Sequence, residues 1–456
     1  MSLDAVQTAI DEFSGSFGGK VMRPGDALYD ETRRVHNGMI DKRPLIIACC
    51  SGTADVKSAL SLGRSLGLDI AVRGGGHNVA GKATVDGGMM IDLAPMTAVL
   101  VDAKARRARV QGGATWAHVN RETQVHGLAV TGGQISSTGV AGLTLGGGVG
   151  WLMAKHGLSL DNLLSVEVVT ADGEVLVASA EDHVDLFWGL RGGGGNFGIA
   201  TCFEFALSPV GPMVTGGLVA HPFSKANDVL RFYRDTTVGL SDDMVVFGAL
   251  IHAPDGSGMK IAALLAAHFG DLAGAEAAMQ PLKSFGPPVM DVIGPLPYCS
   301  LNTMLDGGVP RGALNYWKAS FLSELSDGAI DTMIECFAHC PSPMSGLLLE
   351  HFHGQVTRVA PDATAFPHRG EGFNILILGQ WQNPDETVDS TAWVRDTYDA
   401  LRPFMASGRY VNYLADDEAG DPVRAAYGEN YPRLQTIKAK YDPENVFHLN
   451  QNIQPS

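Results

Sequence analysis

A single histidine stands directly behind a turn of three glycines, a combination that can do chemistry. The sequence there reads Arg73-Gly74-Gly75-Gly76-His77-Asn78, and it follows an apolar run at 70–72 with the character of a strand. Three successive glycines remove every Cβ from the turn, so backbone N–H groups can approach an anion closely. The histidine would face the same ligand. A tight loop with an ordinary surface histidine is the alternative, and the rest of the chain has to decide.

The densest glycine segment of the chain, at 131–151, supports a ligand site. Serine and threonine residues stand beside its glycines. Neither a helix nor a strand accounts for this composition. A backbone wrapped around a long polar ligand does, because peptide N–H groups and hydroxyls can line phosphates and sugars. A purely structural glycine loop is the alternative.

A third glycine cluster has the spacing of a dinucleotide-binding motif. Gly193, Gly195 and Gly198 match GxGxxG. That motif has to follow a strand and open a helix. Residues 199–205 alternate and are rich in strand formers, which predicts a strand after the glycines. The context therefore argues against a Rossmann-type NAD site.

A strand–helix–strand order delivers the first glycine turn. Residues 43–50 predict a buried strand, and Ser51 or Thr53 can cap a helix at 54–66 before the strand that enters the turn. Further strands are expected at 88–93, 97–102, 107–113 and 164–170, the last followed by a hairpin turn at 171–174. Helices are expected at 3–17 and 114–126.

The pattern changes after Pro209, where the glycine clusters thin out. Strands are expected at 215–220, 244–251, 260–267, 346–353, 374–380 and 409–414, and helices at 226–237, 274–285 and 390–401. This predicts a second α+β domain with one sizeable antiparallel sheet. No linker rich in Pro, Ser or Gly separates the parts, so we expect the domains to be closely apposed.

Composition limits the class of protein. The 456 residues exceed the usual size of one core, and a net charge of −16 argues against nucleic acid or an anionic membrane as partner. Cys336 and Cys340 flank His339 but lie on a predicted amphipathic helix, so we expect free thiols and no metal site. The chain has no apolar leader and no run of about 18 apolar residues, which predicts a soluble, cytoplasmic protein.

Five blocks in one order carry a family resemblance. They are RGGGH at 73–77, the glycine cluster with its tryptophan at 142–151, GLSLDN at 157–162, FWGLR with its glycines at 187–198, and the terminal pair YDPEN at 441–445 and NQNI at 450–453. Together they resemble the berberine-bridge-enzyme-like branch of the vanillyl-alcohol-oxidase, or PCMH-type, flavoproteins. The resemblance spans nearly the whole chain.

The resemblance implies an α+β fold of three parts around FAD. These are a two-part PCMH-type FAD-binding domain at 1–209 with its core from about 40, a substrate domain at 210–405 whose antiparallel sheet is covered by helices, and a segment at 406–456 that returns to the FAD domain. The implied cofactor contacts are Arg73, Gly74, Gly75, Gly76, His77, Asn78, Ser137, Thr138, Gly139, Val140, Gly142, Leu143, Gly147, Gly150, Trp151, Asp161, Asn162, Val168, Asn412, Asn450 and Asn452.

Three positions of the resemblance bear on cofactor chemistry. His77 falls on the histidine bonded to the flavin 8α-methyl, a role that suits neutral imidazole as a nucleophile. The cysteine that attaches the flavin a second time in some members is here Ile135, so we expect attachment through His77 alone, which speaks against a carbohydrate oxidase. Thr138 falls on the oxygen gatekeeper, where valine resembles oxidases and leucine resembles dehydrogenases. Threonine has the shape of valine, which favours an oxidase.

Catalytic groups are expected from the substrate domain and from the Tyr-x-Asn-Tyr sequence at 410–413. Tyr413 is the candidate catalytic or substrate-binding phenol, with interface packing as the alternative. The strand expected at 350–357 alternates, so His353 and Gln355 could face the flavin. His351 and His353 lack a third metal ligand. The glutamate that berberine bridge enzyme uses finds no counterpart at the flavin-facing positions of this strand, so we expect that base to be absent or moved.

These observations predict an FAD-dependent oxidase. It would oxidise a small amine, alcohol or phenolic compound by hydride transfer to flavin N5 and pass the electrons to O2 as H2O2. A carbohydrate oxidase, an FAD dehydrogenase and a flavin-binding protein without turnover stay open as alternatives. The identity of the substrate and the oligomeric state are not predicted.

Overall fold

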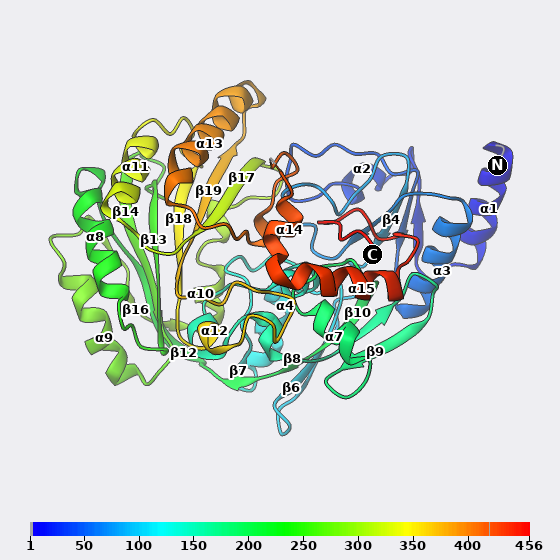
Figure 1. Ribbon diagram of the computed structural model, residues 1–456, viewed down its shortest axis with the longest axis horizontal. Helices are drawn as coiled ribbons and strands as arrows, with labels where there is room; N and C mark the ends of the chain where they lie inside the picture. The colour runs from blue at the N-terminus through cyan, green and yellow to red at the C-terminus, as the bar shows by residue number, and fades with distance from the viewer. Residues whose placement is uncertain (1–2, 419) are drawn as a thin grey trace.

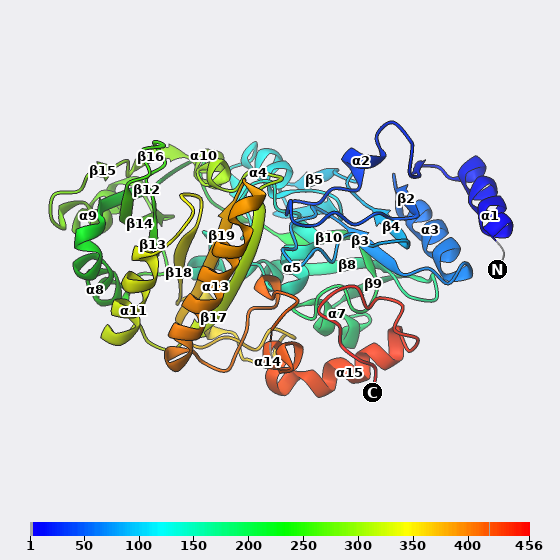
Figure 2. The same cartoon turned by 90° about the horizontal axis from the view of Figure 1, so that it is seen from above.

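The computed structural model describes residues 3–418 and 420–456. Within them lie an eight-stranded sheet, two smaller sheets of four and five strands, and a two-stranded sheet of β7 (Leu128–Ala129) and β11 (Ser208–Pro209). Figure 1 shows two lobes side by side: an eight-stranded sheet with its helices on the left, and two smaller sheets on the right. The C-terminal helices α14 (Pro422–Tyr427) and α15 (Tyr431–Tyr441) lie beside the smaller sheets, as Figure 2 also shows from above. The class is mixed, with helices packed on largely antiparallel sheets.

The first small sheet delivers the glycine turn. Its strand order is β1 (Lys20–Met22), β2 (Ile46–Cys49), β4 (Met89–Asp92) and β3 (Ile70–Arg73). Strands β2, β4 and β3 are parallel, and all four residues of β2 and of β4 are buried. Helix α3 (Thr53–Ser65) connects β2 to β3, and α1 (Leu3–Ser16) packs on α3. The carboxyl end of β3 opens directly into Gly74, so the parallel core fixes where the turn begins.

The second small sheet is antiparallel and has five strands. Their order is β5 (Val99–Asp102), β6 (Arg107–Gln111), β10 (Ile199–Ala206), β8 (Leu163–Val169) and β9 (Val175–Ser179). Helices α4 (Trp116–Gln124), α5 (Val140–Gly146) and α6 (Met153–His156) lie between β6 and β8, and α5 lies within the glycine-rich segment 131–151. Helix α7 (Val184–Leu190) and the glycines up to Gly198 lie between β9 and β10. Strand β10 follows Gly198 directly, which confirms the strand expected there.

The large sheet is antiparallel throughout. Its order is β15 (Met290–Asp291), β12 (Met213–Pro222), β14 (Lys260–His268), β13 (Met244–His252), β18 (Gly346–Phe352), β19 (Gly372–Trp381) and β17 (Leu314–Leu322), with β16 (Gly294–Pro297) paired to β12. Helices α8 (Ala226–Thr237), α9 (Leu272–Ser284), α11 (Asp327–Ala338) and α13 (Thr387–Leu401) cover one face, as Figure 1 shows. Helix α10 (Tyr298–Thr303) joins the sheet to α4. The uncovered face points toward the smaller sheets.

Three expectations about local structure are wrong. The glycine segment does form a helix, α5, because Val140, Ala141 and Leu145 bury one side of it. Strand β18 ends at Phe352 because Gly354 takes a left-handed conformation with φ of 67°, and α12 (Gln355–Arg358) follows. Residues 411–413 form a 3-10 turn instead of a strand.

The C-terminal segment is anchored by a buried ion pair. Lys438 Nζ donates to Asp442 Oδ2 at 2.6 Å, to the Asn196 carbonyl at 2.8 Å and to the Phe447 carbonyl at 2.9 Å. Asp442 also accepts the backbone N–H groups of Val446 and Phe447. Both charged side chains are 0% exposed. The pair therefore ties α15 to the block that precedes β10.

We predict that Lys438→Met lowers the free energy of unfolding by about 3–5 kcal/mol, because the Asp442 carboxylate would stay buried without its cation. Urea denaturation followed by tryptophan fluorescence measures the change. Lys440→Met is the matched control. It removes a lysine from an exposed pair with Asp185 and should cost about 1 kcal/mol or less. Equal losses in the two variants would contradict the prediction.

Candidate active site

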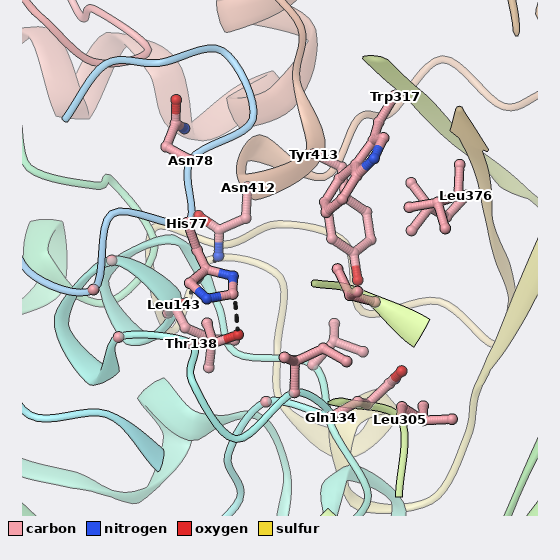
Figure 3. A pocket seen from close by; sticks show the side chains of 18 of the residues that line it. His77, Asn78, Gln134, Thr138, Leu143, Leu305, Trp317, Leu376, Asn412 and Tyr413 are labelled. Atoms are coloured by element: carbon pink, nitrogen blue, oxygen red, sulfur yellow. Dashed lines mark hydrogen bonds between the residues drawn. The ribbon is translucent and has the colours of Figure 1, made fainter. Parts of the chain in front are cut away.

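A cavity of about 1110 Å³ lies between the glycine loops of the small sheets and the uncovered face of the large sheet. Its lining comes from the loop 74–78, from 133–145, from 194–200, from the inner strands of the large sheet, and from 410–413 and 447–451. Figure 3 shows His77 and Tyr413 pointing into the same space from different walls. Segments far apart in the sequence therefore build one site.

The glycine turn meets the second glycine segment by direct backbone contact. A Cβ on Gly75 would lie 2.3 Å from the Gly139 nitrogen, and a Cβ on Gly139 would lie 2.3 Å from the Gly75 nitrogen. No side chain fits between two backbones at that distance. The contact brings His77 next to Ser137 and Thr138.

His77 is held by hydroxyl groups on both ring nitrogens. Its Nε2 lies 2.9 Å from Ser137 Oγ, and its Nδ1 lies 3.5 Å from Thr138 Oγ1, the contact drawn in Figure 3. The ring stacks on His36 with 4.0 Å between the centroids. Burial, with the neighbouring His36 as a smaller cause, lowers the pKa of His77 to about 3. The imidazole is therefore neutral at physiological pH.

Tyr410 and Asn412 fix the C-terminal segment on the glycine loop. The Tyr410 hydroxyl accepts the Gly148 N–H at 3.1 Å, and Asn412 Nδ2 donates to the Leu143 carbonyl at 3.0 Å and to Tyr410 at 3.0 Å. Burial raises the pKa of Tyr410 to about 12, so it stays a neutral phenol. This anchoring places Tyr413 at the cavity wall.

A buried carboxylate stands behind Tyr413. Glu350 Oε1 accepts the Tyr413 hydroxyl at 3.2 Å and Gln134 Nε2 at 2.8 Å, and Oε2 accepts Asn374 Nδ2 at 2.7 Å. Glu350 is 3% exposed. Burial raises its pKa above the usual carboxyl range, although the three hydrogen bonds oppose this. Burial, followed by the Glu350 charge, likewise raises the pKa of Tyr413.

Glu350 overturns the expectation that β18 presents no carboxylate to the site. In the sheet register, Leu348 pairs with Ala249 and with Leu376, and all three line the cavity. Glu350 lies two residues further along β18 and so on the same face. The sequence contained a sign of this. Glu350 is the one charged residue in the run Leu347-Leu348-Leu349-Glu350, and it stands two positions after Leu348, so both side chains point to the same side of the strand.

His353 and Gln355 do not reach the cavity. His353 Nε2 lies 3.0 Å from the Met244 carbonyl, and its ring stacks on His351. Gln355 begins α12 beyond the end of β18. His351 and His353 do share a face, as alternation predicts, but the cavity side of β18 carries the even positions such as Leu348. Gln355 lies beyond the end of the strand, in α12. Among the described residues, no group of three or more His, Cys, Asp or Glu side chains is arranged to hold a metal ion.

The residues expected at the cofactor divide into two groups. Those that line the cavity are Gly74, Gly75, Gly76, His77, Asn78, Thr138, Gly139, Gly142, Leu143, Asn412 and Asn450. Those outside the lining are Arg73, Ser137, Val140, Gly147, Gly150, Trp151, Asp161, Asn162, Val168 and Asn452.

Several residues of the second group have structural partners. The Arg73 guanidinium forms a buried pair with Asp92, and Asp161 pairs with Arg369 at 2.8 Å. A Cβ on Gly150 would lie 1.7 Å from the Gly132 carbonyl oxygen. These side chains shape the loops that line the site.

The site fits FAD on grounds of its own chemistry. Added Cβ atoms at Gly142 and Gly195 would meet open space, so these backbones face the cavity without obstruction. The side-chain oxygen of Asn450, which lines the cavity, is buried and has no hydrogen-bond partner among the described residues. Buried polar atoms of this kind need a partner. A long ligand with both ring systems and polar groups would satisfy these features.

Comparison with known proteins identifies the class. Residues 44–179 match the FAD binding domain family, and residues 409–454 match the family described as berberine and berberine like. The chain is an FAD-dependent oxidoreductase. (R)-6-hydroxynicotine oxidase of Paenarthrobacter nicotinovorans is 30% identical over 457 residues, covering 96% of this chain and 97% of that protein. The chain belongs to the berberine-bridge-enzyme-like flavoproteins.

Other relatives agree with this assignment. Glucooligosaccharide oxidase of Sarocladium strictum is 29% identical and covers 94% of this chain and 90% of its own length. The crystal structure of 6-hydroxy-D-nicotine oxidase from Arthrobacter nicotinovorans superposes with a TM-score of 0.88 at 29% identity, covering 97% of this chain and 99% of that one. The recognition made from the five sequence blocks is confirmed. Within the described residues, no helix has the length and apolarity to cross a membrane.

Proposed function

We propose that this protein is an FAD-dependent oxidase in which Tyr413 and Glu350 take the proton from a substrate O–H or N–H group. The observation that carries the proposal is the hydrogen bond from the Tyr413 hydroxyl to buried Glu350 at the cavity wall. FAD, when bound, accepts a hydride from the substrate carbon and passes the electrons to O2. The chain itself has to orient the substrate, exclude water and hold the proton.

The proton has a defined route through this pair. As a substrate proton moves to Tyr413 Oη, the phenolic proton can move along its hydrogen bond to Glu350 Oε1. The raised pKa of Glu350 makes its carboxylate a better acceptor than an exposed one. Gln134 and Asn374 donate to the same carboxylate and hold it in position.

His77 is proposed as the single covalent attachment point of FAD. Its lowered pKa keeps the imidazole neutral, as a nucleophile requires, and it faces the cavity. Ile135 also lines the cavity and cannot form a second bond. The absence of a cysteine there favours an oxidase of a small amine, alcohol or phenolic compound over a carbohydrate oxidase.

The oxidase assignment, with H2O2 as product, rests on Thr138. This side chain lines the cavity next to His77 and has the width of valine. A short β-branched residue leaves more room for O2 than a leucine would.

We predict that acid precipitation leaves the flavin with the protein pellet. His77→Ala should release it, because no nucleophile remains at that position. The absorbance of the pellet and of the supernatant near the flavin maximum measures the fraction of the flavin that stays with the protein. The exposed His339 gives the matched control, and His339→Ala should retain the flavin. Complete release from the unchanged protein would contradict the covalent bond.

We predict that Tyr413→Phe lowers kcat/KM about 10²- to 10⁴-fold, since the proton loses its first acceptor. Activity of the unchanged enzyme should fall with decreasing pH through the raised pKa of Glu350, because the protonated carboxyl cannot accept a proton. Glu350→Gln should remove that acidic limb along with most of the activity. Tyr316→Phe removes a hydroxyl bonded to Asp417 instead and should stay within about twofold. Full activity in Tyr413→Phe would refute the proton route.

We predict that Thr138→Leu slows reoxidation of the reduced enzyme by O2, measured by stopped-flow absorbance, whereas Thr138→Val keeps the rate. Valine keeps the shape of threonine but lacks its hydroxyl. The Thr138→Val variant therefore distinguishes an effect of side-chain shape from an effect of the hydroxyl contact with His77. Identical rates in all three proteins would rule out a gatekeeping role for Thr138.

A further inference from the structure

The cavity wall formed by the large sheet is apolar. Five neighbouring strands contribute Leu218, Leu265, Ala249, Leu348, Leu376 and Leu378. The sheet register sets several of them side by side, with Leu218 opposite Leu265 and Leu348 opposite both Ala249 and Leu376. Met304 and Leu305 extend this wall from the loop before β17. A substrate resting on this wall meets methyl and methylene groups.

Polar groups interrupt the apolar wall at one end. There Tyr413 and Gln134 line the cavity, with Glu350 directly behind them. Figure 3 shows Tyr413 and Gln134 reaching toward the same region. Gln134 donates its Nε2 to Glu350, so its Oε1 is left as an acceptor for a ligand. Tyr413 Oη also keeps acceptor capacity while its proton points at Glu350. A substrate therefore meets acceptors at this end.

Glu350 and Asp306 give this end of the cavity a negative charge, and no positively charged side chain among the described residues pairs with them. Glu350 receives hydrogen bonds from Gln134, Asn374 and Tyr413, which are all neutral donors. Asp306, beside the lining residues Leu305 and Gly307, accepts from the Ser136 N–H and hydroxyl. Neither carboxylate forms an ion pair with a described residue. A buried negative charge in this setting favours a positive ligand.

The cavity offers little to an anion. Among the described lining residues, Lys82 is the one lysine or arginine, and it pairs with Asp416 at 2.7 Å. It lies on the loop that follows His77. A carboxylate or phosphate at the Tyr413 end would lie near the Glu350 carboxylate without a cation to pair with.

A carbohydrate fits equally poorly. Each sugar hydroxyl carries both a donor and acceptors, and those pressed against the leucine wall would lose their water without gaining a partner. An ammonium group, by contrast, has only donors and a positive charge. It matches the acceptors Tyr413 Oη and Gln134 Oε1 in hydrogen bonding and Glu350 in charge.

We infer that the substrate is an apolar amine, bound with its hydrocarbon body on the leucine wall and its protonated nitrogen at Tyr413, Gln134 and Glu350. The inference deepens the proposed function and uses the same site. It concerns recognition, which precedes the chemical step. It can therefore be tested with ligands that cannot react.

The test is equilibrium binding to the holoenzyme, measured by the change in flavin absorbance. The probes are 2-phenylpropan-2-amine, 2-phenylpropan-2-ol and 2-methyl-2-phenylpropanoate. They share one body and have no C–H bond on the carbon that carries the polar group, so hydride transfer is blocked. We expect the amine to bind about tenfold or more tightly than the alcohol, as opposite charges about 6 Å apart attract in a partly buried site. The carboxylate and methyl β-D-glucoside should bind more weakly than either.

Glu350→Gln keeps the size of the side chain and removes its charge, so it should abolish the preference for the amine over the alcohol. Glu335→Gln removes a carboxylate from α11, on the far face of the sheet, and should leave the preference unchanged. Asp306→Asn should reduce the preference for the amine over the alcohol. This variant replaces Glu350→Gln in the test if the latter fails to fold. Equal or tighter binding of the alcohol, the carboxylate or the glucoside by the unchanged enzyme would overturn the inference.

The binding test is independent of turnover. Selective amine binding by a protein that oxidises no amine, alcohol or phenolic compound would keep the inferred binding mode and refute the proposed oxidase function. Oxidation of a sugar with production of H2O2 would keep the oxidase function and overturn the inference.

Discussion

The close approach of two glycine backbones, at Gly75 and Gly139, is the constraint on which the site depends. Any side chain at either position would overlap the other strand of backbone. The contact joins the end of β3 to the segment before α5, and it sets His77 against the hydroxyls of Ser137 and Thr138. The surrounding elements hold this contact together. Tyr410 caps the same glycine segment from the C-terminal side, and the Lys438–Asp442 pair fixes the chain that follows.

Much of this arrangement could be predicted from the sequence, because glycine reports directly on backbone geometry. The turn at 74–76, the strand after Gly198 and the helix at 226–237 all follow from local pattern, and the structure has them. Long blocks in a fixed order made the family recognisable, although no single glycine run would have done so. The two glycine segments could be assigned to one ligand, but the sequence carried no sign that Gly75 and Gly139 touch.

The errors arose where tertiary context decides. The flavin-facing side of β18 was assigned to the odd positions, which include His353, whereas the even position Leu348 lines the cavity. Gln355 lies beyond the turn at Gly354, in α12. The same misreading hid Glu350, whose importance depends on partners from distant segments, Gln134, Asn374 and Tyr413. Val140 and Leu145 bury α5 against the core, and no local propensity in so glycine-rich a stretch would have predicted a helix. Periodicity gives the face of a residue only while the element continues.

The cavity is closed by residues made at very different times during synthesis. The turn at 74–76 leaves the ribosome early, whereas Tyr410, Asn412 and Asn450 follow more than three hundred residues later. Nascent chains therefore expose half of the cofactor cradle for most of translation. FAD has to enter late, when the C-terminal segment can dock, or else wait in an open half-site. Cofactor supply and chain completion are thus coupled, because the cradle is complete only after the C-terminal segment has docked.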